Sequence, residues 1–355
     1  MTTVLDALNS ALHQAFADDE RVYLIGQDLL DPYGGAFKVS KGLSSAYPER
    51  VITTPVSEAG LTGIAAGMAL RGLRPVVEIM FGDFVALIAD QLVNHIAKFR
   101  WMYNNQVRVP LVVRTPMGGR RGYGPTHSQT LEKIYLGVPG LRVLAACTLQ
   151  AEGTNSQPAG PGELLYHAIL RDDDPVLFIE NKLLYTAAIQ NRESMAEFTI
   201  QAIPVRESSN RVRALVTEDY APTYTLNIQG APSPHMTLAA YGYMAELARE
   251  ALARLAYEHE IFGELVVPTQ LAPPRAEAIV ASARRTGRLL VIEEGSLTLG
   301  WGAEIAAQAC EALGPELKCV RRLAGRDLPV PASPPLEAWV LPGVDEIVQL
   351  AKSMV

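Results

Sequence analysis

Three side chains that could bind a ring or move a proton lie in the first 130 residues, each in a segment that follows a predicted strand. Glu58 lies in TPVSEAG, where a strand ends and a helix begins after a proline. Phe84 lies in FGDF, and His127 ends the glycine-rich stretch GGRRGYGPTH. Histidine titrates near neutral pH and can exchange a proton with a substrate. A glycine-rich loop after the carboxyl end of a strand is where open α/β sheets bind ligands.

Each of these residues also has a plain structural interpretation. A glutamate at a helix start is favoured by the helix dipole, and taken alone that interpretation is the stronger one for Glu58. Phe84 could be a core aromatic, as most aromatics are. For His127 the functional and structural interpretations are evenly balanced. The three residues gain weight only when they are taken together.

The elements that must position these residues are short apolar runs alternating with amphipathic stretches. This alternation predicts a parallel sheet covered by helices on both faces. The predicted strands are 22–26, 51–54, 75–80, 111–114, 141–144 and 176–180, and the predicted helices are 58–70, 83–102 and 163–170.

The pattern breaks after residue 185 and resumes at about residue 236. We expect 186–235 to be a proline-containing linker with a few strands, and 150–162 to be a flexible surface loop rich in Gly, Pro, Ser and Asn. Beyond the linker, the predicted strands are 237–241, 265–267, 288–293 and 317–321, and the predicted helices 243–258, 276–286, 302–313 and 345–354. The predicted fold class is therefore α/β, with two doubly wound domains at 1–185 and 236–355, which suits a chain of 355 residues.

Composition excludes several classes of protein. A hydrophobic content of 48% with 19% charged residues is typical of a globular protein with a large core. The net charge of -7 argues against a nucleic-acid partner. No uninterrupted apolar run is long enough for a membrane span, and the N-terminus lacks the basic start of a signal peptide. Three widely spaced cysteines suggest thiols in a reducing compartment, so we expect a cytoplasmic protein.

Longer stretches of the sequence resemble one known family in order and spacing. The chain resembles the beta subunits of the thiamine-diphosphate-dependent decarboxylase component of the 2-oxoacid dehydrogenases (pyruvate, branched-chain and acetoin), within the transketolase-like superfamily. Residues 1–185 resemble the pyrimidine-binding domain and 236–355 the smaller transketolase C-terminal domain. The matching stretches are GQDLLDPYGGAFKVSKGL, TTPVSEAGLTGIAAGMAL, FGDFVALIADQLVN, PLVVRTPMGG, GPTHSQ, RDDDPVLFIEN, IEEGSLTLGWGAEIAA and VRRLAGRDLPVPASPPLE.

The resemblance implies thiamine diphosphate as cofactor and assigns roles to four residues. Glu58 matches the glutamate that hydrogen-bonds the aminopyrimidine ring and so lets that ring act as a base. Phe84 matches the aromatic that stacks on the pyrimidine, and His127 the histidine near the reacting centre. Asp28, in GQD, falls where the family usually has a glutamate close to the active site. We expect it to belong to the cofactor-binding site as one of the residues that surround the groups in direct contact with the cofactor.

The resemblance also has implications for metal ions and partners. Ile169, Leu170, Asp172 and Asp174 lie where some members bind a monovalent cation such as K⁺, although an acidic helix end before Pro175 explains them equally well. The superfamily's Mg²⁺ motif, GDG, does not occur in the chain. We therefore expect Mg²⁺ and the diphosphate to bind an alpha subunit, in an assembly of two alpha and two beta chains.

Three functions stay open at this point. The first is decarboxylation of a 2-oxoacid with transfer of the acyl unit to a lipoyl-bearing acyltransferase. The second is a free-standing carboligase or a transketolase-like two-carbon transferase. The third is a non-catalytic scaffold subunit, against which the joint presence of Glu58, Phe84 and His127 argues.

Overall fold

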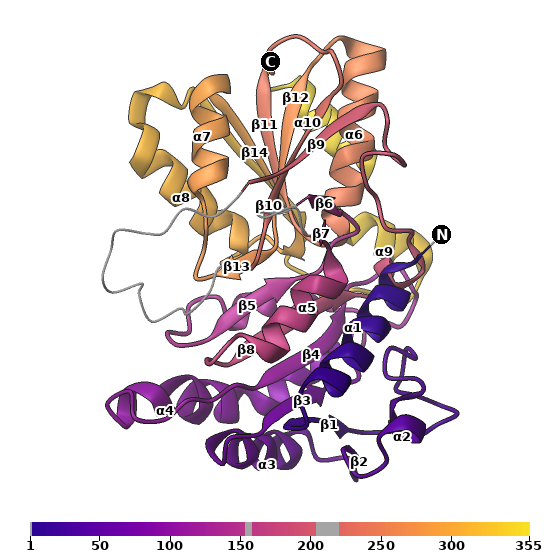
Figure 1. Ribbon diagram of the computed structural model, residues 1–355. Coiled ribbons are helices and arrows are strands. Elements are labelled where there is room, and N and C mark those ends of the chain that lie inside the picture. Colours follow the sequence, from indigo (N-terminus) through magenta and orange to yellow (C-terminus); the bar gives the residue numbers. More distant parts are fainter. Residues whose placement is uncertain (1, 153–157, 204–219) are drawn as a thin grey trace.

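The computed structural model describes residues 2–152, 158–203 and 220–355, and builds them around two sheets. In Figure 1 the first sheet lies in the lower half of the molecule and the second in the upper half, with the C-terminus at the top. The first sheet has seven strands in the order β13-β5-β8-β4-β3-β1-β2, and the second has six in the order β15-β14-β11-β12-β10-β9. The prediction of two α/β domains is confirmed.

The first sheet is parallel apart from one strand. Its parallel strands are β1 (Val22–Gly26), β2 (Val51–Thr53), β3 (Arg74–Glu78), β4 (Val112–Met117), β5 (Arg142–Ala145) and β8 (Val176–Asn181). Strands β3, β4, β5 and β8 are wholly buried, which favours continuous apolar runs, whereas β2 at the edge of the sheet has Ile52 and Thr53 exposed. Because they run in one direction, their carboxyl ends meet at one edge of the sheet.

Helices cover both faces of the first sheet. They are α1 (Val4–Asp18), α2 (Leu43–Ala46), α3 (Glu58–Leu70), α4 (Ala97–Met102) and α5 (Pro161–Leu170). A capping box between Thr3 and Asp6 starts α1. The single helix expected at 83–102 is instead divided into η1 (Gly82–Ile88, a 3₁₀ helix), η2 (Gln91–Ile96, a π-helix) and α4. Short 3₁₀ turns also occur at η3 (Glu132–Ile134) and η5 (Leu184–Thr186).

The second sheet has a parallel part and an antiparallel part. Strands β11 (Met236–Ala240), β12 (Gly263–Pro268), β14 (Arg288–Ser296) and β15 (Cys319–Gly325) are parallel. In Figure 1, α7 (Glu277–Thr286) and α8 (Trp301–Leu313) lie on one side of this sheet, and α6 (Tyr243–His259) and α10 (Val344–Lys352) on the other. The 3₁₀ turn η6 (Gly314–Glu316) follows α8, and α9 (Pro334–Val340) lies toward the first domain.

The segment expected as a linker, 186–235, holds two strands of the second sheet. Strand β9 (Phe198–Ile203) pairs antiparallel with β10 (Thr223–Ile228), which pairs antiparallel with β12. The domain boundaries at 185 and 236 stay a prediction. Of the expected loop at 150–162, β6 (Ala151–Glu152) pairs with β7 (Pro158–Ala159), and 153–157 lie outside the described residues.

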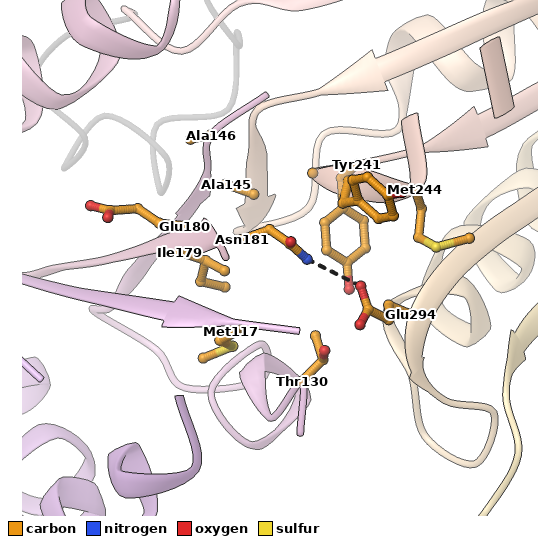
Figure 2. Close-up of a pocket in the computed structure, with 12 residues that line it drawn as sticks. Met117, Thr130, Ala145, Ala146, Ile179, Glu180, Asn181, Tyr241, Met244 and Glu294 are labelled. Carbon is orange, nitrogen blue, oxygen red and sulfur yellow. Dashed lines mark hydrogen bonds between the residues drawn. The ribbon is translucent and has the colours of Figure 1, made fainter. Parts of the chain in front are cut away.

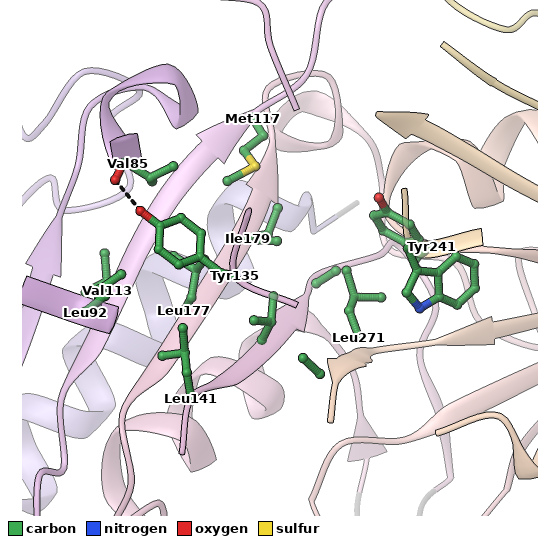
Figure 3. Packing of buried hydrophobic residues seen from close by; sticks show 14 of the residues in the cluster. Val85, Leu92, Val113, Met117, Tyr135, Leu141, Leu177, Ile179, Tyr241 and Leu271 are labelled. Atoms are coloured by element: carbon green, nitrogen blue, oxygen red, sulfur yellow. Dashed lines mark hydrogen bonds between the residues drawn. The ribbon is translucent and has the colours of Figure 1, made fainter. Parts of the chain in front are cut away.

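The two domains share one core. Strand β13 (Gln270–Ala272) comes from the second half of the chain but pairs antiparallel with β5 of the first sheet. One cluster of buried side chains therefore runs from Leu92 and Val113 to Leu271 and Tyr241, as Figure 3 shows. At its centre the Tyr135 hydroxyl donates a hydrogen bond to the carbonyl of Val85. A core continuous across the junction fixes the two sheets relative to each other.

No helix in the described part of the chain is both long enough and apolar enough to cross a membrane.

Candidate active site at the carboxyl edge of the first sheet

The structure places Glu58, Phe84 and His127 on segments that leave the same edge of the first sheet. Glu58 is the first residue of α3, just after β2. Phe84 lies in η1 after β3, and His127 lies in the loop after β4. Their strands are neighbours or near neighbours in the order β4-β3-β1-β2. An edge formed by the carboxyl ends of parallel strands is where α/β proteins bind ligands.

Glu58 is buried, with only 6% of its surface exposed. Among the residues that the structure describes, no hydrogen bond or ion pair engages its carboxylate. The residue stands in the first turn of α3, where the helix dipole favours a negative charge. A buried carboxylate ordinarily has a partner, because leaving an acceptor unpaired costs about 1–3 kcal/mol. Glu58 can therefore accept a hydrogen bond from a bound molecule without giving up one of its own.

Phe84 and His127 are in direct contact within an aromatic cluster. Their ring centroids lie 5.3 Å apart at an interplanar angle of 75°. Phe81 contacts both, at 5.9 Å from Phe84 and 4.7 Å from His127, again edge to face. The Thr126 hydroxyl lies 2.8 Å from Nδ1 of His127. Edge-to-face rings hold one another in position, so this cluster orients the imidazole.

Lys182 is a residue of the site that the sequence analysis missed. It follows β8, has no exposed surface, and donates a hydrogen bond from Nζ to the His127 carbonyl over 2.6 Å. The same ammonium lies 5.4 Å from the centroid of the Phe81 ring. Burial lowers the pKa of Lys182 to about 8. The sequence signal was a lysine directly after an apolar strand, where a cation is unusual.

Asp83 links the segment of Phe84 to the loop of His127. Its two carboxylate oxygens each accept a hydrogen bond from the Gln129 amide at 3.3 Å. Burial raises the pKa of Asp83. These hydrogen bonds join the segment of Phe84 to the loop of His127 at Gln129, two residues after the histidine.

A buried ion network holds three neighbouring strands of the first sheet together. Arg114 of β4 donates to both carboxylate oxygens of Glu180 in β8, at 2.8 and 2.6 Å, and also to Glu78 in β3. The Tyr185 hydroxyl donates to Glu180 at 2.5 Å. Burial raises the pKa of Glu78, and the charge of Arg114 opposes that shift. Each of these three strands leads into one of the segments that carry Phe84, His127 and Lys182.

Asp28 lies at the same edge of the first sheet as Glu58. It follows β1, is exposed, and has a left-handed backbone with φ 54°. Its carbonyl accepts a hydrogen bond from the Gly35 amide at 2.9 Å. Its supporting role at the cofactor site stays a prediction.

The residues predicted to bind a monovalent cation lie just before β8, at the opposite edge of the sheet. There the Arg74 guanidinium donates to the carbonyls of Ile169 and Asp172, both at 2.9 Å. Arg142 donates to the Asp172 carboxylate at 2.9 Å, and Arg100 to both oxygens of Asp174 at 2.7 Å. Within the described residues, no group of three or more His, Cys, Asp or Glu is arranged to hold a metal ion.

Two buried carboxylates of β14 reach the domain junction, and the sequence analysis missed both. Glu294 accepts from the Gly119 amide at 2.6 Å and from Nδ2 of Asn181 at 3.1 Å, the contact dashed in Figure 2. Glu293 accepts from the Gly302 amide at 3.0 Å. Burial, together with the nearby charge of Glu132, raises the pKa of Glu293 to about 8. Burial raises the pKa of Glu132 itself to about 6, against the hydrogen bond from Tyr241.

Similarity to known domain families shows the superfamily to which the chain belongs. The pyrimidine-binding domain of transketolase matches residues 1–187, and the transketolase C-terminal domain matches residues 226–347. A solved structure described as a split-gene transketolase, an inactive beta4 tetramer, covers all of this chain and 98% of its own, with a TM-score of 0.71. At 19% identity that likeness shows the fold alone.

Relatives that match nearly the whole chain show which family of this superfamily it belongs to. A mitochondrial pyruvate dehydrogenase E1 component subunit beta-2 from Oryza sativa is 37% identical over 99% of this chain and 85% of its own length. The corresponding beta-1 subunit of Arabidopsis thaliana is 36% identical over 99% and 88%, and the beta subunit of Rickettsia conorii 31% identical over 99% and 98%. The chain therefore belongs to the family of 2-oxoacid dehydrogenase E1 beta subunits, within the transketolase-like superfamily, and the predicted family is confirmed.

Proposed function

We propose that this chain supplies the pyrimidine-binding half of a thiamine-diphosphate site that decarboxylates a 2-oxoacid. The observation that carries the proposal is the Glu58 carboxylate, which is buried, lacks a partner among the described residues and lies on the same sheet edge as the contact between Phe84 and His127. An acceptor of this kind fits a ring nitrogen that carries a proton. The matches to the transketolase pyrimidine-binding domain and to E1 beta subunits support the same cofactor.

Each residue has a defined task in this proposal. Thiamine diphosphate supplies the electron sink that decarboxylation needs. Glu58 holds the pyrimidine ring through a hydrogen bond and keeps the proton at the bonded nitrogen. Phe84 packs on the ring, a contact worth about 0.5–1.5 kcal/mol beyond its buried area. His127, held by Phe81, Thr126 and Lys182, gives or takes a proton beside the reacting atoms.

The names of the relatives indicate which 2-oxoacid to test as substrate. The relatives from Oryza sativa, Arabidopsis thaliana and Rickettsia conorii, which match 99% of this chain, are named as pyruvate dehydrogenase subunits, which makes pyruvate the first 2-oxoacid to assay. A lipoyl-bearing acyltransferase is the proposed acceptor of the acyl unit. A free-standing carboligase or transketolase-like transferase is not favoured, because the full-length similarity is to E1 beta subunits.

We propose that an alpha subunit completes the site with Mg²⁺ and the diphosphate, in an assembly of two alpha and two beta chains. Apolar side chains beside Glu58 support a partner on this side of the molecule. Val56 is 81% exposed, and Ile64, on the outer face of α3, is 60% exposed. Apolar surface next to a candidate site is typical of a subunit interface.

Two finer points remain proposals. For K⁺, the Arg74 guanidinium already donates to the carbonyls of Ile169 and Asp172, two of the four residues expected to bind the ion, so an ion bound by these carbonyls must share them with Arg74. For location, the cytoplasm stays the prediction from sequence, and the plant relatives are named as mitochondrial.

The test is a Glu58→Gln variant assayed for pyruvate decarboxylation after assembly with the alpha subunit. Loss of the carboxylate charge should lower kcat by about 10²–10⁴-fold, the usual range for a group that directs proton transfer. Glu49→Gln is the matched control, because Glu49 is an exposed glutamate outside the site. Full activity of the Glu58 variant, in an assembly as stable as the control, would refute the proposal.

A further inference from the structure

The loop that carries His127 is fastened by carboxylates from the other domain. Glu337 lies in α9 and has only 4% of its surface exposed. One of its carboxylate oxygens accepts from the Arg120 amide at 2.6 Å, and the other accepts from the Gly122 amide at 3.3 Å. Glu294 accepts from the Gly119 amide at 2.6 Å. Three backbone N–H groups within four residues of this loop thus point at two glutamates more than 170 residues away.

The backbone of the loop is shaped for this contact. Left-handed residues recur along it, with φ of 94° at Gly118, 65° at Arg120, 69° at Gly122 and 78° at Gly124. Left-handed residues within a turn can direct neighbouring N–H groups toward one acceptor. Arg120 adopts this conformation without being glycine, which costs free energy that the surrounding contacts must offset. In this loop the Glu337 carboxylate is the acceptor for the Arg120 and Gly122 amides.

Other contacts confine the loop on both sides of these hydrogen bonds. The Arg120 side chain donates to the Pro342 carbonyl just after α9. A side chain at position 119 would come within 2.6 Å of Leu341, so the backbone there lies directly against the second domain. Toward the other end, Lys182 and Asp83 hold the loop at His127 and Gln129. The first domain thus holds the catalytic end of the loop, and the second domain holds its glycine-rich part.

We propose that Glu337 is a positioning residue for the reaction: its carboxylate holds the Gly118–Gly124 part of the loop in the shape that places His127 against Phe84. Glu337 does not touch the reacting atoms. Its effect passes through the Arg120 and Gly122 amides and along five residues to the imidazole. This inference rests on the proposed role of His127 and adds the group that keeps that residue in place.

The test compares Glu337→Ala and Glu337→Gln with Glu311→Ala, whose glutamate is exposed on α8. Hydrogen exchange is measured on the full chain for the amides of residues 118–124. A hydrogen bond to a charged group is worth about 1.5–3 kcal/mol, so exchange in Glu337→Ala should rise about 10- to 100-fold. Glu337→Gln keeps an acceptor oxygen and should give a smaller rise. The control should match the unmodified chain.

The second readout is steady-state kinetics of the assembled enzyme. Glu337→Ala should lower kcat at least about 10-fold while the KM for thiamine diphosphate stays unchanged, because the pyrimidine contacts at Glu58 and Phe84 are not touched. Unchanged exchange in the loop would overturn the inference, as would unchanged kcat despite faster exchange. If Glu337→Ala does not fold, Glu337→Gln is judged by the same criteria.

A further variant separates this inference from the proposed function. If His127→Ala keeps full activity, the proposed role of His127 is wrong, whatever the loop does. If His127→Ala is inactive and the Glu337 variants keep both slow exchange and full kcat, only the positioning role of Glu337 is wrong.

Discussion

Replacing Arg114 with methionine should destabilise the first domain more than any exposed ion-pair change. Arg114 has 1% of its surface exposed, and its two partners, Glu78 and Glu180, are buried as well, with 4% and 1% exposed. The variant leaves two buried carboxylates facing each other without a cation. Breaking a buried ion pair by removing one partner costs about 3–5 kcal/mol. In a domain of this size that corresponds to a fall in Tm of roughly 6–20 °C.

The loss of stability in Arg114→Met should also become larger as the pH rises. Burial already raises the pKa of Glu78, and without Arg114 that pKa rises further. A group whose pKa is higher in the folded than in the unfolded protein confers stability that is complete below the unfolded pKa and is lost as pH rises through the folded pKa. The free-energy deficit of Arg114→Met relative to the unmodified chain should therefore be larger at pH 8 than at pH 5.5.

The assay is denaturant unfolding at both pH values, with Arg108→Met as the control. Arg108 pairs with Asp173 at 2.5 Å but is 65% exposed, and an exposed pair is worth at most about 1 kcal/mol. Adding Glu180→Gln to Arg114→Met removes one of the two buried carboxylate charges that have lost their cation, and should recover part of the lost free energy of unfolding. A deficit no larger than that of the control, or one that grows as pH falls, would refute the reasoning.

Three further outcomes are expected. His127→Ala should lower kcat by about 10²–10⁴-fold with unchanged binding of thiamine diphosphate to the assembled enzyme, as kinetics and calorimetry will show. Phe84→Ala should weaken cofactor binding at least about 2- to 10-fold, because the ring contact is worth about 0.5–1.5 kcal/mol beyond its buried area; the measurement is calorimetric titration against Leu87→Ala, an exposed residue of the same segment. The pKa of Glu293 is raised from 4.5 to about 8, so its contribution to the free energy of unfolding should be lost progressively between these pH values. Glu293→Gln, which mimics the protonated carboxyl, should show a flatter pH dependence across that interval.

The sequence predicted the parallel strands well because they are buried on both faces. The predicted strand 176–180 differs from β8 by one residue, and 22–26 agrees with β1. Strand β13 was missed because it has three residues and pairs with β5, which is more than 120 residues earlier in the chain. Strands β9 and β10 fall in the expected linker, for which a few strands were predicted. Strand β9 is the edge strand of the second sheet and is only partly buried, so its apolar pattern is weak.

The candidate site was predicted as far as its residues lie in recognisable motifs. Glu58, Phe84 and His127 came from such motifs, and the structure brings Phe84 and His127 into contact. The groups that hold them were not predicted. Glu337 meets the loop at a separation of more than 200 residues, and no local pattern signals such a contact. The single helix expected over 83–102 was wrong in its first part and its middle, where a 3₁₀ helix at Gly82–Ile88 and a π-helix at Gln91–Ile96 change the periodicity.

The central claim is that this chain holds the pyrimidine end of the cofactor while a partner holds the Mg²⁺ and diphosphate end. Calorimetric titration of the purified chain alone with thiamine diphosphate and Mg²⁺, followed by the same titration with the alpha subunit present, tests it most directly. The account predicts no tight binding by the chain alone and tight, Mg²⁺-dependent binding once the partner is added. Tight, Mg²⁺-dependent binding by this chain alone would place the diphosphate site here and contradict the account.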